Sequence, residues 1–149
     1  MKLPQPFAPH SVWVNMNDLR SKSLQQIRPL IPVLSETGAT STAEQFQNQT
    51  LRPVLKYQHD LLIAIFRQYC HERKGSFFQL PKEKKFDYID QATQRDFRFR
   101  NFLLGNITGM FTLEEYRTFL KNKSELTRRA MGMLAQRLKD SLSELTAAL

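Results

Sequence analysis

The 149-residue chain contains a single cysteine, Cys70, and only three histidines, His10, His59 and His71. One cysteine excludes an intramolecular disulfide and any zinc or iron–sulfur site that needs several cysteines, and it fits a reducing compartment. His59 and His71 are twelve residues apart, which on one helix points them about 120° apart around the axis, away from a shared ion. We therefore expect neither a metal site nor a cofactor.

A long apolar run is also missing. No stretch approaches the ~18 consecutive apolar residues of a membrane span, and residues 1–6 lack the apolar core of a secretion signal. We expect a cytoplasmic protein with no membrane partner. Hydrophobic residues at 41% and charged residues at 24% are typical of one ordinary globular domain of this length.

The net charge of +8 raises the question of a nucleic-acid partner. Segments 1–40, 41–75, 76–111 and 112–149 each carry a net charge of +2. A basic arm or tail would concentrate its charge in one block, whereas this chain spreads it over every segment. The distribution disfavours a nucleic-acid-binding arm and leaves open a basic patch assembled in three dimensions.

No convincing strand pair or internal repeat is present, and the hydrophobic spacing is helical. We predict an all-α fold, an antiparallel helical bundle of four or five helices over residues 41–149. Five of the seven prolines lie in residues 1–40, which predicts an extended N-terminal arm with one short helix over 17–27. Phe7, Trp13 and the apolar residues of 27–34 need an apolar surface, so we expect the arm to be partly ordered against the bundle.

Local signals place the helix starts. Ser41 with Glu44, and Thr112 with Glu115, read as capping boxes. Thr50 ahead of Pro53 predicts a kink or a fresh start, and the apolar residues of 51–74 then share one helical face. Further helices are predicted from Pro81 to about residue 110, from Thr112 for a few turns, and from Ser124 over an apolar stripe that ends at Leu145.

Two groups of polar side chains are candidates for function. Gln58 lies within the apolar face of the 51–74 helix and His59 on its border, so both need hydrogen-bonding partners or mark a polar site. Basic residues gather in two clusters that could bind an anion or nucleic acid, interleaved with aromatic residues in the first; they are Arg95, Arg98 and Arg100, and Lys121, Lys123, Arg128 and Arg129. Solvated helix faces are the alternative interpretation of both clusters.

Cys70 and His71 are adjacent, but neighbouring residues on a helix point about 100° apart. Cys70 also belongs near the negative end of its helix, which does not favour a thiolate. We interpret it as a small core-edge residue and predict no catalytic residues.

Residues 27–29, 31–32, 46–48, 50–53 and 111–116 together resemble a set of short, uncharacterised bacterial all-helical proteins. The resemblance covers roughly residues 27–142 and implies a shared fold. Members often carry an automatic "glyoxalase" label, yet glyoxalases use His and Glu metal ligands or a dense His-rich motif, and neither occurs here. That activity is not carried over to this chain.

These observations favour a non-catalytic helical interaction module that binds an unknown protein partner or itself. One alternative is weak nucleic-acid binding through the diffuse basic helix faces. The other is an enzyme with an unrecognised pocket near Gln58 and His59.

Overall fold

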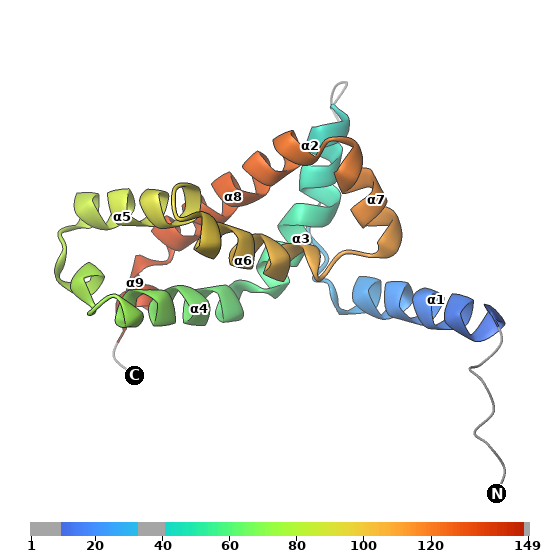
Figure 1. The fold of residues 1–149 in the computed structure, drawn as a ribbon, viewed down its shortest axis with the longest axis horizontal. Coiled ribbons are helices and arrows are strands. Elements are labelled where there is room, and N and C mark those ends of the chain that lie inside the picture. The colour runs from blue at the N-terminus through green and yellow to red at the C-terminus, as the bar shows by residue number, and fades with distance from the viewer. Residues whose placement is uncertain (1–9, 33–40, 148–149) are drawn as a thin grey trace, which may run out of the picture.

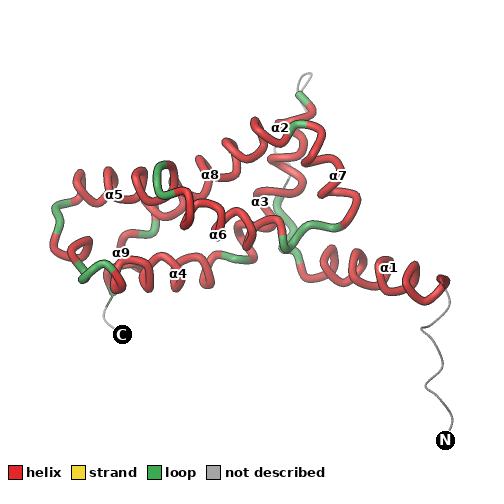
Figure 2. Tube along the Cα trace, viewed as in Figure 1, coloured by secondary structure: helices red, strands yellow, loops and turns green. Residues whose placement is uncertain are grey.

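The computed structural model describes residues 10–32 and 41–147, with side chains described from Asp18 onward in the first range. Within these ranges the chain is helical and contains no strand (Figure 2). The helices are α1 (His10–Ile27), α2 (Thr42–Phe46), α3 (Arg52–Tyr57), α4 (His59–Glu72), α5 (Lys82–Gln94), α6 (Phe97–Thr108), α7 (Leu113–Lys121), α8 (Lys123–Asp140) and α9 (Leu142–Thr146). Among the described residues, no helix is long and apolar enough to cross a membrane.

Helix α8 is the element around which the body is built. It contacts α5 and α6 on one side, α2 and the turn that follows α2 on another, and α7 and α9 at its ends. Seven of its side chains are buried. They recur every three or four residues along the helix, which explains how α8 packs against several neighbouring helices. Helix α1 is different, because it projects away from this body (Figure 1).

Aromatic side chains fill the body in two groups. Phe66 of α4 contacts rings of the first group, which also contains Tyr69, Phe77, Tyr88 and Phe99. The second group lies at the α2–α7 end, where the rings of Phe46 and Phe111 meet edge to face with centroids 5.5 Å apart and Phe119 joins them. Full burial of one such ring stabilises the fold by about 1.5–3 kcal/mol.

Pro53 shapes the connection between α2 and α3. The kink predicted near Thr50 takes the form of a π-helical turn, η1 (Gln47–Leu51), in which the Arg52 amide donates to the Gln47 carbonyl five residues earlier. A proline ring clashes with the carbonyl four residues before it, and a π-turn relieves that clash by widening the helix. The chain therefore continues past Pro53 without a loop.

The predicted helix from Pro81 to about residue 110 is wrong in one respect, because it is two helices. Helix α5 ends at Gln94, and Asp96 starts α6 by accepting the Phe99 amide at its carboxylate, 3.2 Å away. The same carboxylate accepts the Tyr69 hydroxyl at 2.8 Å and the Arg73 guanidinium at 3.0 Å. Aspartate is a preferred N-cap residue, but the prediction of one continuous helix gave Asp96 no such role.

The other predicted helix boundaries lie close to the observed ones. Ser41 caps α2 through the Glu44 amide, and Thr112 and Glu115 form the expected capping box. The final helix begins one residue before Ser124 and is interrupted at Ser141, and the 51–74 helix is interrupted at Gln58.

The N-terminal arm is more helical than predicted, since α1 covers His10–Ile27 and not only 17–27. Residues 28–32, here called the strap, carry the chain away from the end of α1. The predicted docking of Phe7, of the Trp13 side chain and of residues 33–34 lies outside the described part of the chain.

Replacing Asp96 by alanine should lower the free energy of unfolding by about 2–3 kcal/mol, because an N-cap is lost and the buried Tyr69 hydroxyl loses its acceptor. Urea denaturation followed by circular dichroism measures this. The matched control is Asp87→Ala, which removes an exposed carboxylate of α5 and should change stability by less than about 0.5 kcal/mol. Equal effects in the two variants would show that Asp96 does not join α4 to α6.

Candidate interaction site

The side chains of Gln58 and His59 both form hydrogen bonds to other residues of the body. The Gln58 amide donates to the Asn106 carbonyl at 3.1 Å. His59 lies between Arg137 and Glu144: a guanidinium can only donate, so Nδ1 of His59 accepts from Arg137 at 3.3 Å and Nε2 donates to Glu144 at 2.9 Å. Both ring nitrogens are thus engaged, and the predicted enzyme pocket at this position stays a prediction.

His59, Asp60 and Glu144 place three potential metal-ligating atoms within 4.8 Å of one another. Sequence spacing missed this cluster, because Glu144 comes from α9. The surroundings suit a cation poorly. A metal-bound histidine normally donates its second ring N–H to a carboxylate or carbonyl, whereas His59 meets the positive guanidinium of Arg137 there.

Cys70 is completely buried against the aromatic core. Burial raises the pKa of its thiol to about 12, although the Tyr88 hydroxyl and the Arg73 charge act in the opposite direction. A thiol with such a pKa is almost entirely protonated at neutral pH and is a poor nucleophile. The position agrees with the interpretation of Cys70 as a structural residue.

The predicted basic clusters are split between two turns. Arg95, Arg98 and Arg100 surround the turn between α5 and α6, where Phe97 is 70% exposed and Phe99 is buried. Lys121 and Lys123 flank the turn between α7 and α8, which lies in a separate part of the body (Figure 1).

Farther along α8, Arg128 is exposed, whereas Arg129 is held by Glu125 and by the side-chain oxygen of Gln47. Nucleic-acid binding through these faces stays a prediction.

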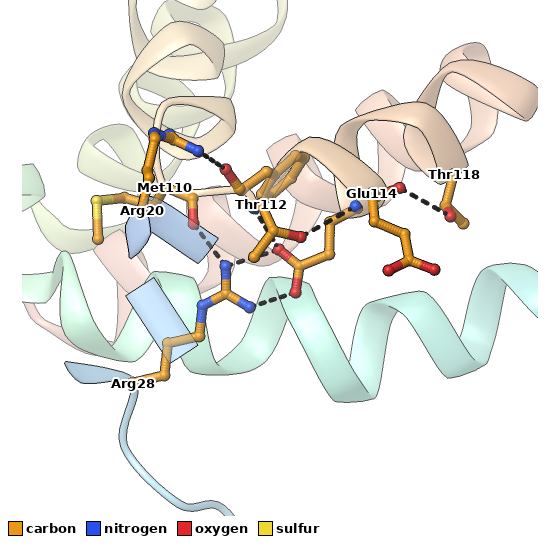
Figure 3. A network of polar contacts seen from close by, with 8 residues as sticks. Arg20, Arg28, Met110, Thr112, Glu114 and Thr118 are labelled. Atoms are coloured by element: carbon orange, nitrogen blue, oxygen red, sulfur yellow. Dashed lines mark hydrogen bonds and ion pairs between the residues drawn. The ribbon is translucent and has the colours of Figure 1, made fainter. Parts of the chain in front are cut away.

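A polar network that the sequence did not predict attaches the strap and α1 to the body (Figure 3). Arg28 forms a bidentate ion pair with Glu115, in which the contact to Oε2 of Glu115 is 2.7 Å long. The same guanidinium also donates to the Met110 carbonyl. Arg20 donates to the carbonyls of Phe111 at 2.7 Å and Gly109 at 2.9 Å. Two arginines therefore satisfy three consecutive carbonyls just after α6, where a helix end attracts cations.

Glu115 serves two neighbours at once. One carboxylate oxygen accepts the Thr112 amide at 2.8 Å, which closes the capping box of α7, while the carboxylate also receives Arg28. Burial acts to raise the pKa of Glu115, but the hydrogen bonds from Arg28 and Thr112 and the charge of Arg28 outweigh it and hold that pKa below its usual value. The Arg28 side chain is only 8% exposed, so the pair is shielded from water.

Within its described side chains, α1 contacts the body through Arg20, and the strap that follows it contacts the body through Arg28. None of its described side chains, residues 18–27, is buried. Leu19 is 60% exposed and Ile27 is 44% exposed, and in the strap Leu30 is 96% exposed. The described part of α1 and the strap therefore keep these apolar side chains at the surface.

Beside the strap lies a groove with a volume of about 900 Å³. The strap forms one wall, residues 42–53 of α2, η1 and α3 form a second, and the first turns of α7 close the third. Most of its lining residues are polar and include Arg28 and Glu115 themselves, but apolar atoms contribute more of the lining surface than polar atoms do.

A smaller hollow of about 400 Å³ lies between α4 and α6 and is mostly apolar, with Ile65, Tyr69, Phe99 and Phe102 in its lining.

Sequence reasoning missed the network because its partners are 82 to 91 residues apart. Arg20 and Arg28 are eight residues apart, which places them about 80° apart on a helix, but nothing local indicates that their acceptors follow α6. Comparisons of the chain with protein-family models, with curated proteins and with solved structures find no match. The resemblance to the proteins labelled "glyoxalase" therefore stays a prediction.

Glu115→Gln should destabilise the fold by up to about 3 kcal/mol at neutral pH, because it leaves a buried guanidinium without its counter-charge. The Glu115 carboxylate contributes above the usual glutamate pKa, and its contribution is lost as pH falls through the depressed folded pKa. The difference between wild type and variant should therefore shrink in acid, as measured by urea denaturation at several pH values. Glu114→Gln, at an exposed neighbour, is the control, and a pH-independent difference at Glu115 would contradict the assignment.

Cys70 should react with a thiol reagent such as dithionitrobenzoate only when the core opens, because it combines complete burial with a raised pKa. The measurement is the labelling rate of the native chain as a function of urea, with a cysteine introduced at exposed Ser143 in a Cys70→Ala background as the accessible reference. Labelling of Cys70 as fast as that of the reference would show that the core around α4 is open in the native state.

Proposed function

We propose that this chain is a non-catalytic helical interaction module whose contact helix is α1 and whose partner is a second copy of the chain. The observation that carries the proposal is that α1 is fixed in place by Arg20 and Arg28 while no described side chain of α1 is buried. Helices of globular domains normally bury an apolar stripe, so the exposure of the apolar residues in the described part of α1 supports a surface used for association.

A second copy is the occupant that the chain itself supplies. In a two-fold symmetric pair the same surface appears on both sides, so Leu19 and Ile27 of one α1 meet their equivalents on the other. The two positions lie about 80° apart around the helix axis, close enough to share one contact face. The polar anchoring of α1 supports this arrangement, because it lowers the entropy that would otherwise be lost on association.

The surroundings of Cys70 and His59 support a non-catalytic role. Cys70 is buried and protonated, and His59 is held between Arg137 and Glu144. We also propose that residues 41–149 form an antiparallel bundle of four or five helices and that residues 1–40 are its arm. The protein is proposed to be cytoplasmic.

Leu19→Asp should prevent self-association without unfolding the chain, because Leu19 is mostly exposed and contributes little to the core. Sedimentation equilibrium over a range of concentrations measures the effect: the average mass of the wild type should rise above that of the monomer, and the variant should stay monomeric. Leu120→Asp is the matched control, since Leu120 is 47% exposed and belongs to α7 and not to α1. A wild type that remains monomeric at every concentration would exclude the second copy as partner.

A further inference from the structure

One histidine ring joins three helices of the body. His59 is the first residue of α4, Arg137 lies in the last turn of α8, and Glu144 belongs to α9. Nδ1 of His59 lies 3.3 Å from the Arg137 guanidinium, and Nε2 lies 2.9 Å from the Glu144 carboxylate. The His59 side chain is 22% exposed, so both contacts are partly shielded from water.

The two contacts require one particular form of the ring. A guanidinium is always charged in proteins and can only donate, so Nδ1 must carry a lone pair to accept from Arg137. An ionised carboxylate can only accept, so Nε2 must carry a hydrogen to donate to Glu144. His59 therefore holds α8 and α9 together as a neutral imidazole protonated at Nε2.

A second proton on this ring has only one place to go. It binds Nδ1, because Nε2 already carries a hydrogen. The Nδ1–H group then cannot accept from Arg137, and an imidazolium faces a guanidinium across the same 3.3 Å contact. Like charges repel at this separation, even near the surface. The contact with Glu144 changes in the opposite direction, since an imidazolium forms a stronger hydrogen bond to a carboxylate than a neutral ring does.

Carboxylates supply the other charges at this junction. Asp60 of α4 places a carboxylate oxygen within 4.8 Å of Nε2 of His59 and of the Glu144 carboxylate. Asp140 follows Arg137 by three residues in α8, a spacing at which helical side chains are neighbours. Burial lowers the pKa of Arg137, while the charges of Asp140 and Glu144 oppose that shift. Both carboxylates thus lie near enough to attract the guanidinium when it leaves Nδ1.

We propose that protonation of His59 switches the α4–α8–α9 junction between two states. In the neutral state the ring links Arg137 of α8 to Glu144 of α9. In the protonated state the ring pairs with Glu144 and Asp60, while Arg137 leaves Nδ1 and turns to Asp140. Acid therefore removes the side-chain link between α4 and α8 that runs through His59 and keeps the link between α4 and α9. The inference uses no residue of α1 or the strap and does not rest on the proposed self-association.

The form of the ring can be measured directly on the wild-type chain by ¹⁵N nuclear magnetic resonance. The signals of His59 are those that disappear in the His59→Ala variant. At alkaline pH, Nδ1 should show the chemical shift of an unprotonated ring nitrogen and Nε2 that of a protonated one. The opposite tautomer, or an even mixture of the two, would overturn the proposal. The same titration provides one pH value at which the ring is neutral and one at which it is protonated.

A double-mutant cycle tests the switch at these two pH values. It combines His59→Ala with Arg137→Met, which keeps an unbranched side chain but removes the charge, and it measures unfolding in urea. With the ring neutral, the coupling should lower the unfolding constant by about fivefold, the size of one ordinary hydrogen bond. With the ring protonated, the coupling should vanish or change sign. A favourable coupling that is the same at both pH values would refute the switch.

Two further cycles act as controls. His59→Ala with Glu144→Gln should show a favourable coupling at both pH values, larger when the ring is protonated and the carboxylate still ionised. Loss of this coupling on protonation would contradict the retained α4–α9 link. His71→Ala with Arg137→Met should show no coupling, because His71 is an exposed residue of α4 whose ring lies against Phe78. A pH-dependent coupling at His71 equal to that at His59 would show that the effect is not specific to the junction.

Discussion

The position of the strap and of α1 depends on one constraint: the carbonyls that follow α6 must be satisfied. The carbonyls of Gly109, Met110 and Phe111 all accept from Arg20 or Arg28. A guanidinium offers five donors in a planar fork, so one arginine can serve a carbonyl and a carboxylate together, as Arg28 does. Lysine would lack this geometry. The N-terminal segment therefore completes the end of α6 and the start of α7 through side chains that come from about ninety residues away.

Polar anchoring has a consequence that apolar packing would not have. A helix that docks by burying its apolar stripe loses that stripe as a binding surface. Here Arg20 and Arg28 specify the position of α1 while Leu19 and Ile27 remain exposed. A buried ion pair contributes modest net stability because desolvation opposes the attraction, yet its geometry is restrictive. The two arginines thus orient α1 and leave the apolar side chains of Leu19 and Ile27 exposed.

The sequence predicted features governed by neighbouring residues and missed those governed by distant ones. Both predicted capping boxes are local, since Ser41 with Glu44 and Thr112 with Glu115 act within one turn. The Thr112 box is confirmed in full, whereas at Ser41 the side chain accepts the Glu44 amide as an N-cap without the reciprocal bond from the Glu44 carboxylate. Asp96 also acts locally, as the N-cap of α6, but the sequence prediction of one helix from Pro81 to about residue 110 did not include it. The Arg28–Glu115 pair spans 87 residues, and Glu115 already had a complete local explanation as a capping residue. A second role could not be inferred from its spacing.

The groove illustrates the same limit for charge. Counting charges along the chain gives +2 in every segment, which predicts a uniformly basic coat. Folding changes the local balance, because it pairs Arg28 with Glu115 and Arg129 with Glu125, while Glu44 and Glu114 form no ion pair with any residue that the structure describes. The local charge on a basic protein therefore depends on contacts that a count along the sequence does not show.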